Sequence, residues 1–125
     1  MKCLVVDDSA TMRRIVINAL KTIGYQDAVE AADGREALAR WDASIEMLIT
    51  DWNMPNMGGL ELVQHLRSDP KTARIPILMV TTRSLKEDIV QALDAGINNY
   101  VLKPFTPQVL KDKLDQVVAS ASGAA

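Results

Sequence analysis

Short apolar runs alternate with longer segments of helical periodicity along nearly the whole chain. The runs are rich in Val, Ile, Leu and Met and occupy residues 3–6, 28–32, 47–50, 75–80 and 100–102, the run at 28–32 being the weakest. Such runs are typical of buried strands. Strands separated by helices form a parallel sheet with right-handed crossovers. The pattern therefore predicts an α/β fold, a five-stranded parallel sheet of flavodoxin-like (βα)5 type with strand order 2-1-3-4-5.

The segments between the runs predict five helices. In the clearest one, apolar side chains fall on one stripe with basic residues outside it, and Gly24 ends the helix. Three more helices are expected at residues 34–41, 59–67 and 85–95. The fifth begins at Pro107, with Thr106 as its N-cap.

Length and composition indicate one soluble domain. The 125 residues fit a single domain, 1–125, with residues 119–125 expected as a short flexible tail. A net charge of −2 argues against nucleic-acid binding. Cys3 is the only cysteine, so it cannot form an internal disulfide. Because neither a signal peptide nor a membrane-length apolar stretch is present, we expect a cytoplasmic protein without membrane contact.

Polar side chains follow four of the apolar runs at the points where the strands should end. They are Asp7, Asp8, Asp51, Thr81, Thr82 and Lys103. Because ligands of open parallel sheets bind beyond the carboxyl ends of the strands, we expect these side chains to converge on one edge. Taken singly, each has a plain explanation: Asp8 could cap the next helix, and Thr81 could simply end a strand. Their joint placement favours a site.

Three carboxylates within a few ångströms would repel by about 4 kcal/mol per close pair at an effective dielectric near 20. Lys103 supplies only one compensating charge. Either a carboxyl stays protonated or a hard divalent cation binds. We predict Mg²⁺, with Asp8 and Asp51 as direct ligands, Asp7 acting mainly through water, and the backbone carbonyl of Asn53 as a further ligand.

A metal beside a lysine and a hydroxyl is also suited to bind phosphoryl oxygens. A carboxylate can act as the nucleophile and form an aspartyl phosphate. Asp51 is the best candidate for this acceptor, because it follows the central strand between the acid pair and the pair Thr81 and Lys103.

At these residues the sequence resembles the receiver domains of two-component response regulators, and most closely those of single-domain chemotaxis regulators. The matching stretches are residues 5–8, 11–16, 51–57, 78–81 and 100–106, within a resemblance that covers residues 4–118. The resemblance implies that Asp51 takes a phosphoryl group from a phosphohistidine of a CheA-like histidine kinase. Its Mg²⁺ would be held by Asp7, Asp8, Asp51 and the Asn53 carbonyl.

The resemblance also implies roles for Thr81, Lys103 and Tyr100. Thr81 and Lys103 would bind phosphoryl oxygens, and Thr81 with Tyr100 would switch a face formed by the fourth helix, fifth strand and fifth helix. That face would dock a target such as the flagellar motor switch protein. A phosphatase is a further candidate partner, the chain is expected to be a monomer, and the peptide before Pro104 should be cis. Such a switch catalyses only its own phosphoryl uptake and hydrolysis and is not an enzyme with a separate substrate.

Some residues and alternatives stay open. Arg83 stands where such chemotaxis regulators carry a glutamate, and with Asn53 it flanks the approach of water to an acyl phosphate. Trp52 is expected to be half-exposed over the site, and Arg13 to lie on a solvated helix face or to meet a partner. The alternative functions are a phosphorelay intermediate or another non-chemotaxis regulator. A remote alternative is a haloacid-dehalogenase-type phosphatase, whose first strand is followed by Asp-x-Asp rather than by adjacent acids.

Overall fold

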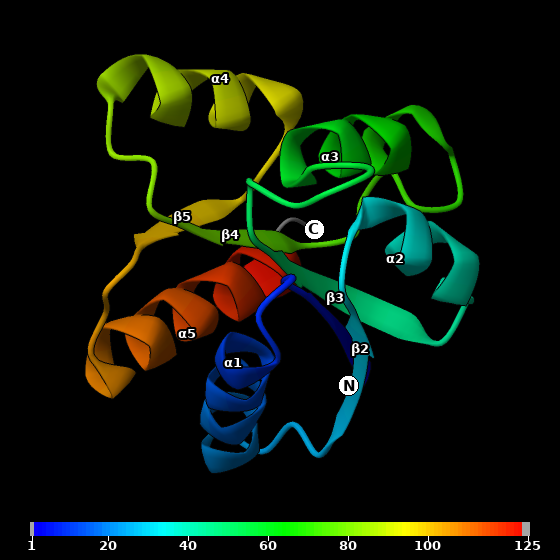
Figure 1. The fold of residues 1–125 in the computed structure, drawn as a ribbon. Coiled ribbons are helices and arrows are strands. Elements are labelled where there is room, and N and C mark those ends of the chain that lie inside the picture. The colour runs from blue at the N-terminus through cyan, green and yellow to red at the C-terminus, as the bar shows by residue number, and fades with distance from the viewer. Residues whose placement is uncertain (1, 124–125) are drawn as a thin grey trace.

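A parallel sheet of five strands forms the centre of the computed structural model, which describes residues 2–123 (Figure 1). The strands are β1 Lys2–Val6, β2 Asp27–Ala31, β3 Ile45–Thr50, β4 Ile77–Thr81 and β5 Asn99–Leu102. Their order is β2-β1-β3-β4-β5, and every pairing is parallel. The predicted fold class and strand order are therefore confirmed.

Helices cover both faces of this sheet. Helices α1 and α5 lie on one face, and α2, α3 and α4 lie on the other (Figure 1). The helices are α1 Ala10–Thr22, α2 Gly34–Arg40, α3 Gly59–Ser68, α4 Lys86–Ala95 and α5 Pro107–Gly123. Within the described part of the chain, no helix is both long and apolar enough to cross a membrane.

Two separate cores result from the alternation of side chains along each strand. In β1, Leu4 and Val6 pack under the layer of α2, α3 and α4. Cys3 and Val5, which point the other way, pack against α1 and α5. These four residues thus pack against helices on both faces of the sheet. This packing holds β1 in place and so determines where Asp7 and Asp8, which follow it, lie.

The strands differ in burial according to their place in the sheet. The central strands β1, β3 and β4 are buried almost throughout. The edge strands β2 and β5 are only partly buried, because each has one neighbour and lies at the margin of the helical layers. The expectation of buried strands is therefore wrong for these two.

A capping side chain determines where α1 begins. Helix α1 begins at Ala10 because the Ser9 hydroxyl accepts a hydrogen bond from the Met12 amide at 3.2 Å. Ser9, and not Asp8, therefore caps this helix.

At the other end of the chain, α5 continues through Gly123. The expected tail at 119–125 is thus helical as far as Gly123, in keeping with the good helix propensity of alanine, and residues 124–125 lie outside the described residues.

Cys3 provides a test of the packing around β1. Its side chain is fully buried, and burial raises the pKa of the thiol to about 11. Because only the thiolate reacts, we expect a thiol reagent such as Ellman's reagent at pH 8 to leave the native protein unmodified while it labels the urea-unfolded chain completely. Fast labelling of the native protein would contradict the packing described for β1.

Candidate functional site

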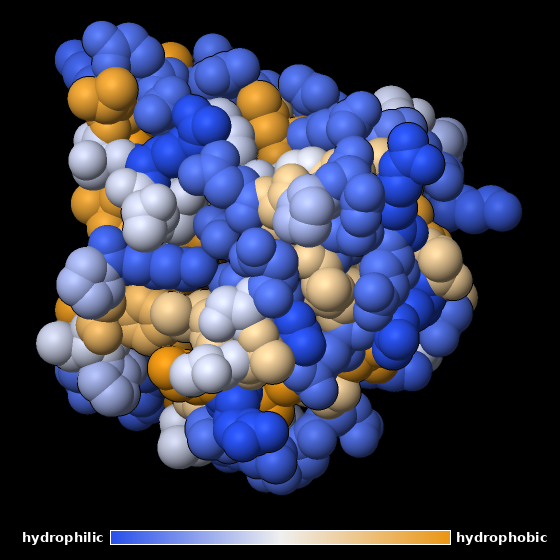
Figure 2. Space-filling model, viewed as in Figure 1, coloured by the Kyte–Doolittle hydropathy of each residue, from blue (hydrophilic) through white to orange (hydrophobic). Residues whose placement is uncertain are grey.

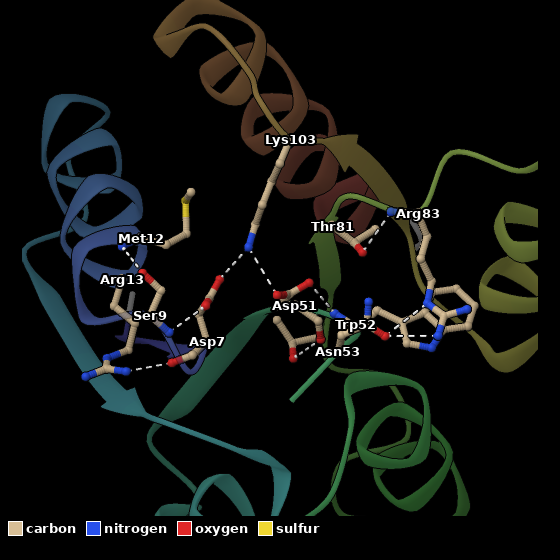
Figure 3. Close-up of polar contacts among 11 residues, drawn as sticks. Asp7, Ser9, Met12, Arg13, Asp51, Trp52, Asn53, Thr81, Arg83 and Lys103 are labelled. Carbon is tan, nitrogen blue, oxygen red and sulfur yellow. Dashed lines mark hydrogen bonds and ion pairs between the residues drawn. The ribbon is translucent and has the colours of Figure 1, made fainter. Parts of the chain in front are cut away.

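The polar residues at the strand ends meet at one edge of the sheet (Figure 3). Backbone hydrogen bonds between neighbouring strands continue into the site: the Asp51 amide donates to Val6 at 2.9 Å, and the Lys103 amide donates to Thr81 at 2.8 Å. The Asp7 amide likewise donates to the Ala31 carbonyl at 3.1 Å. The sheet therefore holds the backbones of all three charged residues, and the Lys103–Pro104 peptide that follows is cis, as expected.

The Lys103 ammonium lies between two of the carboxylates. Its Nζ is 2.8 Å from Asp7 Oδ2 and 3.1 Å from Asp51 Oδ2. All three side chains are largely buried, with exposed fractions of 13% for Lys103, 6% for Asp7 and 12% for Asp51. Ion pairs in such partly desolvated surroundings are screened far less than pairs at the surface. Lys103 thus links the ends of β1, β3 and β5.

The second oxygen of each paired carboxylate is bound by a backbone amide. Asp7 Oδ1 accepts from the Ser9 amide at 2.9 Å, and Asp51 Oδ1 accepts from the Trp52 amide at 2.6 Å (Figure 3). Both carboxylates are therefore fixed in orientation before any ligand arrives. Asp8 differs, because its side chain is exposed and takes part in no hydrogen bond or ion pair among residues 2–123.

Burial opposes the ionised form of Asp51. Desolvation raises the pKa of this carboxyl, against the lowering effects of Lys103 and the Trp52 amide. For Lys103, burial alone would lower the pKa of the ammonium, but its bonds to Asp7 and Asp51 outweigh burial and the pKa is raised. Lys103 therefore offsets only part of the cost of burying the ionised Asp51 carboxylate. A further cation bound beside it would stabilise the ionised form.

A divalent cation fits this arrangement. Asp7, Asp8 and Asp51 each offer a carboxylate oxygen, and these oxygens all lie within 4.8 Å of one another. Carboxylate oxygens are the ligands that Mg²⁺ prefers, and each bound carboxylate oxygen still has a free lone pair. The exposed Asp8 opens the group to solvent. Asn53 lies two residues beyond Asp51 in the same loop, and the role of its carbonyl stays a prediction.

Thr81 and Tyr100, the expected switch residues, are joined through Arg83. Thr81 is completely buried at the end of β4, and its Oγ1 accepts from the Arg83 amide at 3.2 Å. The Tyr100 hydroxyl donates to the Arg83 carbonyl. A movement of Thr81 would therefore disturb the backbone segment that also holds Tyr100.

Trp52 is not half-exposed as predicted. Only 7% of its surface is accessible, because it packs into the core beneath α2, α3 and α4. The Arg83 guanidinium lies over its ring, 4.5 Å from the centroid. Arg83 Nε and Nη2 also donate to Asn53 Oδ1 at 3.1 and 2.9 Å, and Nη1 is 3.6 Å from Asp88. Arg83 thus covers one side of the site.

Arg13 supports the acid pair, a role that the sequence analysis missed. Its Nη1 donates to the Asp7 carbonyl at 2.6 Å (Figure 3). Its Nε pairs with Glu30 at 2.9 Å. The side chain is only 17% exposed, so the solvated-face interpretation is wrong for Arg13, whereas Arg14 is exposed. The available signal was a basic residue in the first turns of the helix that directly follows the acid pair.

Comparisons with known proteins agree with this geometry. A family model described as the response regulator receiver domain matches residues 3–115. The chain is 55% identical over 122 residues to chemotaxis protein CheY1 of Helicobacter pylori, covering 96% of this chain and 98% of that protein. It is 53% identical over 128 residues to the CheY homolog of Campylobacter jejuni, covering 98% and 96%. The solved structure of the chemotaxis response regulator CheY4 of Vibrio cholerae has a TM-score of 0.85 and 39% identity, covering 93% of this chain and 97% of that one.

The charge at Asp51 leads to a stability prediction. In metal-free buffer at pH 7, Asp51→Asn should raise the free energy of unfolding measured with urea by about 1 kcal/mol, because it removes a carboxylate that burial deprives of solvation and that also lies close to the like charge of Asp7. The raised pKa means that the folded state disfavours the ionised carboxyl. The difference from wild type should therefore shrink as pH falls through the raised pKa of the folded-state Asp51, and it should vanish below ~4, where Asp51 is protonated in both states.

The same measurement with Mg²⁺ tests the metal site. Wild type should gain about 2.7 kcal/mol when free Mg²⁺ reaches 100 times its dissociation constant. Asp51→Asn should lose most of this gain, whereas Asp27→Asn, at the exposed start of β2, should keep it. Equal Mg²⁺ responses in all three proteins would contradict the proposed ligands.

Proposed function

Because the chain belongs to the family of response regulator receiver domains and resembles chemotaxis regulators of CheY type, we propose that it is a phosphorylatable signalling switch. Asp51 accepts a phosphoryl group from a phosphohistidine of a CheA-like kinase. The observation that carries this proposal is the convergence of Asp51, Lys103 and the acid pair at one edge of the sheet.

Phosphoryl uptake begins with an oxygen of ionised Asp51. Lys103 and the Trp52 amide favour this ionised form and hold the carboxylate in place. The oxygen attacks phosphorus, a P–O bond forms and the P–N bond of the phosphohistidine breaks. The electron pair of that bond stays on the imidazole nitrogen, which is then protonated by solvent. The products are an acyl phosphate on Asp51 and a neutral histidine on the kinase.

Charge on the transferring group is balanced from several strand ends. Lys103 is paired with Asp7 and Asp51, and its ammonium would turn toward the phosphoryl oxygens once they are present. The hydroxyl of Thr81, at the end of β4, would bind a phosphoryl oxygen from another side. A bound Mg²⁺, held by Asp7, Asp8, Asp51 and the Asn53 carbonyl, would neutralise phosphoryl charge. Beyond this uptake and its hydrolysis, the chain turns over no separate substrate.

The output surface is the face formed by α4, β5 and α5. Large apolar side chains are exposed there, namely Leu85, Val90, Leu93, Leu102 and Val109. In Figure 2 hydrophobic atoms appear along the left side, where Figure 1 places α4 and β5. Loss of the bonds that Arg83 makes to Thr81 and Tyr100 would free Tyr100 to reshape this face for a target such as the flagellar motor switch protein. We place this monomeric switch in the cytoplasm, with a phosphatase as a further partner.

The alternatives receive less support. A phosphorelay intermediate or another non-chemotaxis regulator would use the same site, but the relatives described above carry chemotaxis names. A haloacid-dehalogenase-type phosphatase does not agree with the matched family or with the adjacent acids Asp7 and Asp8.

Direct phosphorylation tests the proposal. Incubation with acetyl phosphate and Mg²⁺ should add the mass of one phosphoryl group to the intact wild-type protein. Asp51→Asn should stay unmodified, because it lacks the nucleophile, and chelation of Mg²⁺ should suppress uptake in wild type. Asp27→Asn serves as the matched control and should be modified normally. Modification of Asp51→Asn to the wild-type extent would refute the assignment of the acceptor.

Arg83 should govern how fast the phosphoryl group is lost. Because it stacks on Trp52 and binds Asn53 beside the acceptor, its removal should open the approach of water. Arg83→Ala is expected to hydrolyse its acyl phosphate about threefold to tenfold faster, which corresponds to about 1 kcal/mol of barrier. The decay is followed by intact mass after acetyl phosphate is removed. Arg74→Ala, an exposed arginine between α3 and β4, should decay like wild type, and an unchanged rate in Arg83→Ala would rule out this role.

A further inference from the structure

Asp33 and Asn56 form a partly buried contact outside the acid cluster. Asp33 is 9% exposed and uses its two carboxylate oxygens differently. Its Oδ1 accepts from the Glu36 amide at 2.8 Å and so caps α2. Its Oδ2 accepts from the side-chain amide of Asn56 at 2.8 Å. One carboxylate thus ties the start of α2 to the loop between β3 and α3.

A second contact runs alongside the first. The Gly34 amide donates to the Met57 carbonyl at 2.9 Å. The approach is so close that a Cβ at residue 34 would lie 2.6 Å from Cγ of Met57. Asp33 and Gly34 therefore bind Asn56 and Met57, two consecutive residues binding two consecutive residues. No larger side chain fits at Gly34 without displacing Met57.

The loop held in this way is residues 52–58, which connects Asp51 to α3. It is closed by a hydrogen bond of 2.8 Å from the Gly59 amide to the Trp52 carbonyl. A Cβ at Gly59 would lie only 1.9 Å from the Asp51 carbonyl oxygen, so the start of α3, where the loop ends, packs directly on the backbone of the acceptor. Any displacement of the loop is thereby transmitted to the site.

Asn56 stands in a conformation that needs support. Its φ is 64°, and it is the one non-glycine residue with positive φ in the described chain, residues 2–123. Asparagine tolerates this left-handed conformation better than most residues, but such backbone is kept where the surroundings determine it. Met54 and Met57 on either side of this position pack on the core, whereas Asn56 itself is exposed and its side chain is held by the Asp33 carboxylate.

We propose that Asp33 and Asn56 are positioning residues for the metal site, an inference that rests on the proposed function. Their hydrogen bond holds the 52–58 loop so that Asn53 presents its carbonyl toward the acid cluster. On the opposite side Arg83 holds the Asn53 side chain, so Asn53 is supported from two directions. Residues that orient metal ligands without touching the metal commonly alter metal affinity when replaced.

The test uses variants that break the contact without removing other local structure. Asn56→Gly keeps a residue that adopts positive φ, and Asp33→Ser keeps a side chain that can cap α2. Asp33→Asn keeps the cap through its Oδ1, and its side-chain amide can donate to Oδ1 of Asn56 once the Asn56 amide group turns over. Asp42→Ser is the matched control, because Asp42 also binds a loop amide, that of Ser44 at 2.7 Å, and carries the same charge on a loop outside the acid cluster.

Mg²⁺ affinity of the full chain is measured by calorimetry, and the free energy of unfolding of each variant is measured with urea in the absence of metal. Asn56→Gly and Asp33→Ser should each weaken Mg²⁺ binding by about tenfold, and the double variant should be no weaker than either single variant. Asp33→Asn and Asp42→Ser should stay within about twofold of wild type.

Each other outcome has a definite meaning. If Asn56→Gly and Asp33→Ser lose unfolding free energy but bind Mg²⁺ like wild type, the contact is structural only and the inference is overturned. Strictly additive losses in the double variant, or a loss in Asp42→Ser equal to that in Asp33→Ser, would overturn it as well. Failure of the wild-type protein itself to bind Mg²⁺ would instead refute the metal site of the proposed function.

Discussion

The ammonium of Lys103 lies between carboxylates that the sheet brings together from separate strands, and the rest of the site depends on this contact. Asp7 and Asp51 are placed by backbone hydrogen bonds of the sheet, so they cannot move apart to relieve their repulsion. Burial makes the ionised form of Asp51 costly, and Lys103 offsets only part of that cost. Because Lys103 alone is paired with these two carboxylates in the described residues, the acidic edge favours ligands that bring positive charge or that place negative charge next to Lys103.

The fold explains why a charged edge of this kind is stable. Side chains of β1 alternate between two cores, so the backbone that leads into Asp7 is secured on both faces of the sheet. The loops around the edge are then tied to one another by polar side chains: Arg13 binds the carbonyl of Asp7, Arg83 binds Asn53, and Asp33 binds Asn56. Arg83 also connects the site with Tyr100, because its carbonyl accepts from the Tyr100 hydroxyl.

Much of the fold and the centre of the site could be predicted from the sequence. Both follow from the spacing of apolar residues and from the polar residues placed directly after the strands. Apolar runs locate the strands, and the first polar residue after each run locates Asp7, Asp51 and Lys103. The surroundings of Trp52 and Arg13 could not be predicted in this way. Whether a loop or first-turn side chain points to solvent or to a neighbouring loop depends on elements far away in the sequence, such as β2 and the segment around Arg83. The extension of α5 through Gly123 was missed because small residues without a clear apolar stripe resemble a tail.

The most direct measurement of the central claim is a crystal structure of the chain with Mg²⁺ and beryllium fluoride, which imitates a phosphoryl group on a carboxylate. The account predicts beryllium bonded to a carboxylate oxygen of Asp51, with Lys103 and Thr81 on its fluorides and Mg²⁺ among Asp8, Asp51 and the Asn53 carbonyl. Beryllium bound to Asp7 or Asp8, or an unmodified Asp51 beside a fully loaded metal, would contradict it.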